Sequence, residues 1–392
     1  VNYTLPLRKI KILDWTKLTT KYSASYEWRN APPASKSLGN TIQNSRSIAV
    51  NGNLNFVSLY NKVPFLKKIN RPPPIKKLTK DLDENGEDKV NKEEQKEGMS
   101  SAARSLFKFI MMLKQAQFGA TFTDGTTLPG FTPSIDLLGQ NFGKNTPGFP
   151  FILGAQDETF RNTIAANGFL TTDTNQIARY LNLSSVDITG SATIEPIKGF
   201  RISVNFNKRQ SFNVTSNFRY SQTQADFDDV FYTEVGTFTT SFGTWNTMFD
   251  KLNDDYSSAA FDQFKNNRYT IAQRLQVREF TGNGAYANRY ENQLNVIDDS
   301  TGFPIGFSNK HQEVLTHAFI AAYSGKNAST SSLNPFKNLP IPNWRISYNG
   351  LTKLDIFKEI FSNISISHGY SSTLNISSFQ QPPLYGIDSL ER

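Results

Sequence analysis

Residues 199–224 read GFRISVNFNKRQSFNVTSNFRYSQTQ, and apolar and polar side chains alternate along this stretch. A period of two is typical of a β-strand, because successive side chains point to opposite faces. The alternation breaks after Asn207 and resumes at Ser211, so we interpret the stretch as the two strands of a hairpin. The apolar face then consists of Phe200, Ile202, Val204, Phe206, Phe212 and Val214, and the polar face of Arg201, Asn205, Asn213, Asn217 and Arg219. The pattern alone fits an apolar face in the core of a soluble β-sandwich or one in contact with lipid.

The composition argues against a helical membrane protein and against a disordered chain. Only 38% of the 392 residues are hydrophobic, and no apolar run reaches the roughly 18 residues that a transmembrane helix needs. The 31 Phe and 15 Tyr residues are many for so polar a chain, whereas disordered chains are poor in aromatics. There is no Cys, which excludes disulfides and thiolate chemistry. The net charge of +8 is scattered along the chain, so we expect no nucleic acid as a partner.

Further alternating segments are longer than the strands of most soluble proteins. They cover 16–29, 46–60, 105–123, 186–195, 231–243, 344–355 and 363–377. Strands of soluble proteins have about 5–6 residues, whereas membrane-spanning strands need about 9–11. Aromatic residues cluster near the segment ends, as in the interface girdles of membrane barrels. The sequence therefore predicts an all-β, antiparallel transmembrane β-barrel, with a large β-sandwich as the alternative.

The connections predict which end of each strand faces which side of the membrane. Residues 195–199, EPIKG, form a tight turn in which Pro presets φ and Gly permits a left-handed position. If this turn is periplasmic, strands starting at 16, 105, 200, 231 and 363 run outward, and those starting at 46, 186, 211 and 344 run inward. We therefore expect barrel strands in 1–66, a charged disordered periplasmic loop in 67–100, a strand in 101–123, an extracellular cap in 124–185, a strand meander in 186–243, a partly helical extracellular insertion in 244–343, and strands in 344–392.

Short helices are expected in the two extracellular segments. Residues 157–168 predict a helix closed by Gly168, and residues 247–264 predict a helix with a capping pattern at Thr247 and Asp250. Residues 312–325, QEVLTHAFIAAYSG, are ambiguous between helix and strand. We expect these helices to form a cap over the barrel mouth.

No residue pattern predicts catalysis or a cofactor. His311, His317 and His368 lack metal-ligand spacing, and the aspartates at 226, 228 and 229 are interpreted as a solvated turn. The protein is accordingly not expected to be an enzyme. The polar strand residues instead predict a water-filled lumen lined by uncharged amides and hydroxyls, with Arg201, Asn205, Asn213, Asn217 and Arg219 as lumen-facing candidates. The alternative, that this face is simply exposed to solvent, remains open.

Five stretches carry a resemblance to a known family. They are LPLRKIKILDWTKLTTKYSASYEWRNAP (5–32), SLGNTIQNSRSIAVNGNLNFVSLYNKVPFLKK (37–68), TTLPGFTP (126–133), EPIKGFRI (195–202) and THAFIAAYSGKN (316–327). Together they resemble the SprA/Sov family, the giant outer-membrane translocon proteins of the type IX secretion system, which also support gliding motility. The resemblance spans most of the chain and is to an internal portion of the family's much longer proteins.

The resemblance implies a function and a set of partners. Members of this family pass folded cargo proteins with secretion signals from the periplasm to the cell surface through one very large barrel. The implied partners are the cargo, a PorV-like outer-membrane barrel, a periplasmic plug protein, a peptidyl-prolyl isomerase-like subunit and outer-membrane lipid. The implied location is the bacterial outer membrane. A TonB-dependent receptor or porin-like channel for small solutes, and a soluble extracellular β-adhesin, are the alternatives.

Overall fold

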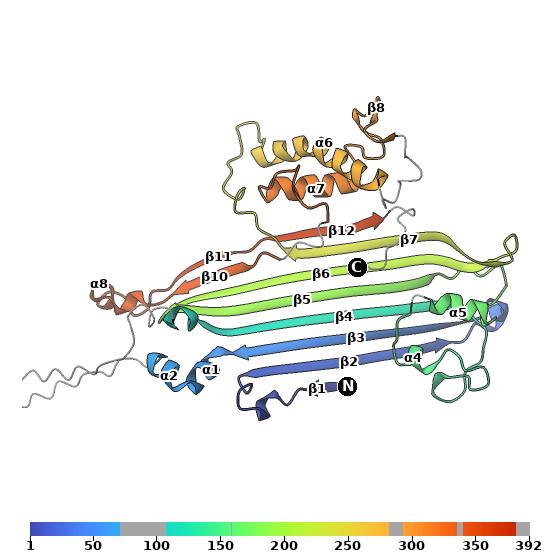
Figure 1. Cartoon of the computed structure of the whole chain (residues 1–392), viewed down its shortest axis with the longest axis horizontal. Coiled ribbons are helices and arrows are strands. Elements are labelled where there is room, and N and C mark those ends of the chain that lie inside the picture. Colours follow the sequence, from blue (N-terminus) through green and yellow to red (C-terminus); the bar gives the residue numbers. More distant parts are fainter. Residues whose placement is uncertain (71–106, 158, 282–292, 335–339, 382–392) are drawn as a thin grey trace, which may run out of the picture.

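The computed structural model describes residues 1–70, 107–157, 159–281, 293–334 and 340–381. Within these residues, ten strands form one antiparallel sheet (Figure 1). The sheet contains β1 (Asn2–Thr4), β2 (Thr16–Arg29), β3 (Asn40–Asn55), β4 (Leu113–Phe131), β5 (Tyr180–Ile197), β6 (Phe200–Ser221), β7 (Asp226–Ser241), β10 (Asn343–Tyr348), β11 (Ile366–Tyr370) and β12 (Thr373–Gln381). The charged loop predicted at 67–100 lies, beyond residue 70, outside the described residues.

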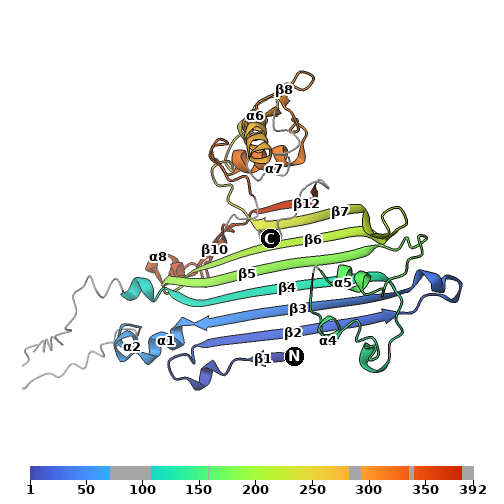
Figure 2. The same cartoon turned by 45° about the vertical axis from the view of Figure 1, so that its right-hand side comes forward.

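Helices flank the sheet at both strand ends and beyond one edge (Figures 1 and 2). They are α1 (Phe56–Lys62), α2 (Pro64–Asn70), α4 (Phe149–Ile152), α5 (Phe160–Ala166), α6 (Ala259–Phe280), α7 (Gln312–Tyr323) and α8 (Asp355–Lys358). A two-stranded sheet of β8 (Ile297–Asp298) and β9 (Phe303–Pro304) accompanies α6. Among the described residues, no helix has the length and apolar character needed to cross a membrane.

The sheet is open. One edge is formed by β1 and β2, the other by β11 and β12, and no described strand joins the two edges. The all-β, antiparallel prediction is confirmed for the sheet. The described strands do not close on themselves, so they do not form a closed barrel.

β6 is one strand of 22 residues, and the predicted hairpin at 199–224 is wrong. Its pairing with β5 continues from Ile197↔Phe200 to Tyr180↔Ser216 without a turn at 208–210. The strand continues because Phe206, Lys208, Gln210 and Phe212 are all even-numbered and lie on one face, as an uninterrupted strand requires. The break in the sequence pattern is a polar interruption of one face and not a reversal of the chain.

β7 and β10 share the second edge of β6. Residues 208–221 of β6 pair with β7, and residues 200–205 pair with β10. Both strands run antiparallel to β6, so the chain leaves the sheet at Ser241 and returns at Asn343 to continue in the same direction. The predicted insertion at 244–343 therefore starts and ends in the middle of the sheet. The strand at 231 runs antiparallel to the strand at 200, so the same direction predicted for both is wrong.

The insertion folds around a small core of its own. Helices α6 and α7 pack through Ile271, Leu275, Val314 and Ala318, with Phe307 closing the cluster. The predicted helix at 247–264 starts later, at Ala259, because the side chain of Ser258 accepts the backbone N–H of Phe261 and caps the helix there. Most of the ambiguous segment 312–325 is helix α7 (Gln312–Tyr323).

The two strand ends of the sheet differ. At one end, which we call the turn end, β5 and β6 are joined by the short turn around Gly199, and α1, α2 and α8 lie nearby (Figure 1). At the opposite end, residues 132–179 connect β4 to β5 and contain α4 and α5; we call this segment the cap. The predicted boundaries 124–185 are corrected because β4 extends to Phe131 and β5 begins at Tyr180. The predicted helix at 157–168 is confirmed as α5.

The register divides the side chains of β2–β6 and β10 between two faces. Even-numbered residues lie on one face, here the even face, and odd-numbered residues on the other, here the odd face. In β4 this holds from Gln115 to Leu128, and in β5 up to Ile194. Toward the turn end the even face is apolar. This apolar band consists of Leu18, Tyr22, Ile48, Val50, Leu54, Ala116, Phe118, Ala120, Phe122, Val186, Ile188, Ala192, Ile194, Phe200, Ile202, Val204, Phe206, Trp344 and Ile346.

A row of alternating glycine and phenylalanine crosses the apolar band. The register places Gly52 beside Phe118, Phe118 beside Gly190, and Gly190 beside Phe206. Each Phe ring lies over its neighbouring glycine, in the space that a Cβ would need. Glycine kinks covered by cross-strand aromatic rings are a means of bending a sheet. A hollow lies on the odd face along the same strands.

This packing predicts the effect of adding one methyl group. Gly190→Ala places a Cβ inside the ring of Phe206 and is expected to lower stability by roughly 1–3 kcal/mol through overpacking. Gly125→Ala is the control, because its Cβ would meet its nearest neighbour at 3.4 Å and should be neutral or slightly stabilising. The urea midpoint of the purified protein measures both effects. If Phe206→Leu fails to rescue Gly190→Ala, ring overlap is not the cause.

Candidate functional site

The odd face is mostly polar, apart from Leu181 and Leu183 near the cap end, and it carries a shallow hollow. The hollow has a volume of about 570 Å³ and crosses β2–β6 near the glycine–phenylalanine row. Its polar lining consists of Lys17, Thr19, Asn51, Asn53, Gln117, Thr189, Ser191 and Asn205. Amides and hydroxyls dominate this lining and charge is sparse, so the surface offers many weak hydrogen bonds and no strong binding point.

The five predicted lumen-facing residues lie together on the odd face. Asn205 lines the hollow, Arg201 lies toward the turn end, and Asn213, Asn217 and Arg219 follow along β6 toward the cap end. The prediction placed them on one face of a two-stranded hairpin. They share a face instead because all five belong to the single strand β6. Their partition between the two faces was predicted from parity alone.

The six predicted lipid-facing residues share the even face but differ in what covers them. Phe200, Ile202, Val204 and Phe206 are half-buried and belong to the apolar band. Phe212 and Val214 are only 8% exposed. The ring of Phe212 lies edge-on to that of Phe379, with 5.7 Å between the centroids. Protein covers these two side chains, so the prediction that they contact lipid is wrong for this part of β6.

The apolar band ends abruptly toward the cap. Its last row pairs Tyr22 with Ile48, Ile48 with Phe122, and Phe122 with Val186. The next row of the even face is polar, and there Arg46 Nε lies 3.0 Å from Asp124 Oδ2. Ser184 Oγ donates to the other carboxylate oxygen of Asp124 at 3.0 Å. The change from apolar to charged side chains thus occurs within one step along three neighbouring strands.

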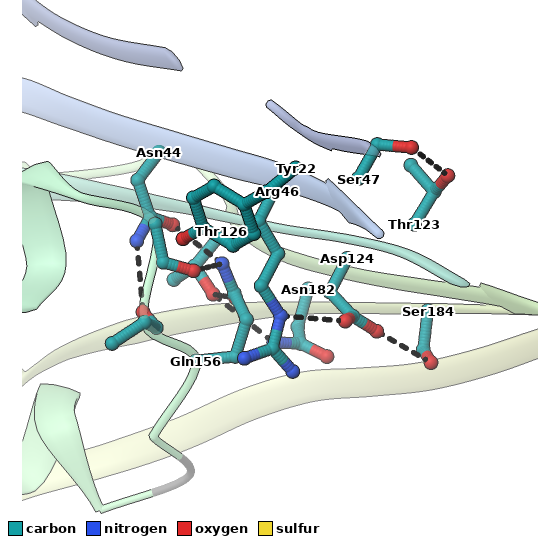
Figure 3. A network of polar contacts seen from close by, with 12 residues as sticks. Tyr22, Asn44, Arg46, Ser47, Thr123, Asp124, Thr126, Gln156, Asn182 and Ser184 are labelled. Atoms are coloured by element: carbon teal, nitrogen blue, oxygen red, sulfur yellow. Dashed lines mark hydrogen bonds and ion pairs between the residues drawn. The ribbon is translucent and has the colours of Figure 1, made fainter. Parts of the chain in front are cut away.

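A chain of amides holds the cap on the even face (Figure 3). Asn44 Nδ2 donates to the carbonyl oxygens of Phe151 and Ala155, each at 2.9 Å. Gln156 Nε2 donates to Asn44 Oδ1 at 3.0 Å, and Gln156 Oε1 accepts from Thr126 Oγ1 at 2.8 Å. Asn44 is only 1% exposed, so a lost partner would leave a buried polar group unsatisfied. The network therefore fixes residues 151–156 against β3 and β4.

An arginine clamps the rest of the cap to the sheet. Arg161 of α5 makes a bidentate pair with Asp229 of β7, with Nη1–Oδ1 at 2.8 Å and Nη2–Oδ2 at 2.6 Å. Its guanidinium carbon lies 4.7 Å from the ring centroid of Tyr180 and 4.9 Å from that of Phe218. Ser216 Oγ donates to Asp229 Oδ1 at 2.6 Å. Asp229 is therefore part of an ion pair, and the prediction of a solvated turn is wrong for this residue.

The cap and the sheet also share an apolar cluster. Ile42, Leu128, Tyr180 and Phe218 of the even face pack with residues of the cap, including Phe151, Ile164 and Leu170. The cap thus covers the cap end of the even face. The expected position of the cap over a barrel mouth stays a prediction, because the described sheet is open.

Aromatic rings mark the point where the helical insertion leaves the sheet. Trp344 stacks on Tyr370 with 4.4 Å between the centroids, and Trp245 stacks on Trp344 at 5.2 Å. The hydroxyl of Tyr370 accepts the backbone N–H of Thr244 at 2.8 Å and donates to the carbonyl oxygen of Phe242 at 3.1 Å. These contacts replace the strand pairing that the interruption removes.

The described part of the chain was compared with the requirements of a metal site, and its one buried histidine serves packing. Across the described residues, no group of three or more side chains is arranged to hold a metal ion. His317 is buried in α7, where its Nε2 donates to the carbonyl oxygen of Leu333 at 2.5 Å. Burial, with Arg278 and Arg274 adding to it, lowers the pKa of His317 to about 4. The imidazole is therefore neutral at pH 7 and serves packing.

Sequence reasoning missed Asn44, Gln156 and Arg161. Each lies in a segment whose polarity is ordinary. Asn44 and Gln156 are 112 residues apart, and Arg161 is 68 residues from Asp229. One signal was available in the sequence. Asn44, Arg46 and Asp124 occupy even-numbered positions, which are apolar elsewhere in the same alternating segments, so polar residues there indicate a local polar contact.

The chain was compared with protein-family models and with curated proteins. No protein-family model matches the chain, and a search of the curated proteins gave no match either.

The clamp predicts how firmly the cap is held. Arg161→Met removes two charge-assisted hydrogen bonds and is expected to weaken the docking of α5 by roughly 2 kcal/mol, or about 30-fold faster amide exchange. Hydrogen exchange of residues 159–170 is the measurement. Arg209→Met is the control, because Arg209 is exposed and lies 3.9 Å from Asp187. Unchanged exchange in Arg161→Met would show that the apolar cluster alone holds the cap.

Proposed function

We propose that this chain forms part of the wall of a wide β-barrel in the bacterial outer membrane. The apolar band contacts lipid, and the odd face lines a water-filled lumen. One observation carries the proposal: the two faces are segregated along all strands from β2 to β6, apolar on one side and amide- and hydroxyl-rich on the hollowed side. Alternation of apolar outward and polar inward residues is the pattern of membrane-spanning strands.

The strand lengths support the same proposal. Strands β3–β6 have 16, 19, 18 and 22 residues, whereas about 9–11 suffice to cross a bilayer. The excess length extends beyond the membrane at the cap end. The even face is polar there or packs against the cap, as a wall in water requires.

The open edges support a barrel larger than this sheet. In hydrocarbon every backbone N–H and C=O must be paired, so an edge strand within a bilayer needs a neighbour. β1 covers only Thr19–Lys21 of β2, and the outer edge of β2 beyond Tyr22 has no strand partner among the described residues. Further strands would complete the wall on both sides, and lumen diameter grows with strand number.

The substrate and partners come from the resemblance to the SprA/Sov family. The wall would belong to the type IX secretion translocon and conduct folded cargo proteins with secretion signals to the cell surface, supporting gliding motility. A PorV-like barrel, a periplasmic plug protein and a peptidyl-prolyl isomerase-like subunit would be its partners. A lining of amides and hydroxyls suits this task, because hydrated cargo of varied sequence must pass without being bound tightly.

Deletion of the gene tests the transport function. We expect exported proteins that normally reach the cell surface to accumulate in the periplasm in folded, active form, and gliding to stop. The measurement is cargo activity in periplasmic and surface fractions. Normal secretion together with reduced uptake of small sugars would overturn the proposal in favour of a porin or TonB-dependent receptor. A protein that partitions into buffer without detergent would instead be a soluble adhesin.

Single cysteines test the assignment of the two faces. The chain contains no Cys, so each variant carries one thiol. In washed outer-membrane fragments, a charged maleimide should label Arg201→Cys, Asn205→Cys and Asn217→Cys, because their side chains face water. It should not label Ile202→Cys or Val204→Cys until the membrane is dissolved, because a thiol in hydrocarbon does not ionise. The reverse pattern would overturn the assignment.

A further inference from the structure

The cap carries apolar side chains that its own core does not use. Leu137, Leu138, Phe142, Phe149 and Leu153 are between 43% and 73% exposed. Phe149 and Leu153 are four residues apart on α4 and its C-cap, so they share one side of this turn. The ring of Phe142 lies 6.4 Å from that of Phe149. Phe142, Phe149 and Leu153 therefore lie close together, and we call them, with Leu137 and Leu138 of the same segment, the cap patch.

The cap patch adjoins the apolar band. The Tyr22 hydroxyl, in the last row of the band, donates to the carbonyl oxygen of Leu153. The next residue, Gly154, has a φ of +90° and lies against Ala24 and Arg46 so closely that a Cβ would be 2.9 Å from Ala24 Cβ. Leu153 therefore lies directly beside the end of the band and on the same face of the sheet.

The cap patch is held rigidly and is almost uncharged. The amide network of Asn44 fixes the backbone at Phe151 and Ala155, and Tyr26 donates to the carbonyl oxygen of Gly139 at 3.2 Å. Residues 137–156 contain one charged side chain, Lys144, and the neighbouring Asp136 accepts the backbone N–H of Phe142 at 3.2 Å. A fixed apolar surface with few charges at its margin fits the boundary between lipid headgroups and acyl chains.

We propose that the cap patch is an interfacial lipid anchor. Leu137, Leu138, Phe142, Phe149 and Leu153 insert into the headgroup region of the leaflet on the cap side, about 5–10 Å deep, as apolar side chains of interfacial segments do. The inference rests on the proposed contact of the apolar band with lipid. The cap patch adds a second contact with the bilayer, in the plane of the headgroups. This contact sets how deep the wall sits in the membrane.

Depth-dependent quenching tests the anchor. Single cysteines at Phe149 and Leu153 receive an environment-sensitive fluorophore, and the protein is reconstituted into bilayers with nitroxide-labelled lipids. Nitroxides near the headgroup should quench both labels more than nitroxides deep in the acyl chains. A label at Ile177→Cys is the matched control, because Ile177 is an equally apolar, 71% exposed residue of the cap that lies near the start of β5, away from the band. It should not be quenched by either lipid.

A label at Ile202→Cys distinguishes the failure of the anchor from the failure of the proposed function. Quenching of this label by the deep nitroxide, with none at Phe149 and Leu153, would overturn the anchor and leave the membrane wall intact. No quenching at any of the three positions would overturn both. Protection of the Phe149 and Leu153 labels only while a copurifying protein is present would assign the cap patch to a protein partner and overturn the lipid anchor.

Discussion

The backbone ladder of β6 supports the rest of the sheet. One edge pairs with β5 over nearly its whole length, and the other pairs with β10 and then with β7. β6 thus joins the strands on the N-terminal side to those that follow the helical insertion. Because the side-chain period in a strand is two, this ladder also fixes the face of every residue on its neighbours. A shift of one residue along β6 would place Arg201 and Asn205 among the apolar band and would destroy both faces.

The sequence predicted the strand chemistry well and the chain path poorly, and β6 shows why. Parity assigns Phe200 and Val214 to one face and Arg201 and Asn213 to the other, because alternation is a local property. Whether Lys208 and Gln210 interrupt a strand or end it depends on the neighbours β5 and β7, which no local pattern reveals. The hairpin error reversed the predicted direction of the strand at 231. A second error followed, because the chain was expected to reverse between the strands at 231 and 344, whereas β10 runs in the same direction as β7. The two errors cancel, so the directions predicted for the strands at 344 and 363 agree with the sheet.

The contacts that hold the cap were beyond prediction for a related reason. Asn44 and Gln156 are 112 residues apart, and Arg161 and Asp229 are 68 residues apart. Each is polar in a chain rich in polar residues, so nothing distinguishes it until the fold brings its partner near. Helix α5 of the cap was predicted, because its signals, Gly168 and the short apolar pattern before it, lie within the segment itself. The face that the cap covers was not predicted, because the apolar cluster at Ile42 and Phe218 continues the same alternation as the band.

The helical insertion limits how far a lipid-facing band can extend. α6 carries Asp262, Lys265, Arg268, Arg274 and Arg278, and charged side chains in hydrocarbon are costly. Yet the insertion leaves the sheet at mid-length, and Ile320 of α7 packs with Phe238 and Leu374. The even side of β7 and β12 must then contact protein or water, which agrees with the burial of Phe212 and Val214. From Lys208 onward β6 pairs with β7. In the proposed wall, the even face therefore contacts lipid on the β5 side of this pairing and does not contact lipid on β7.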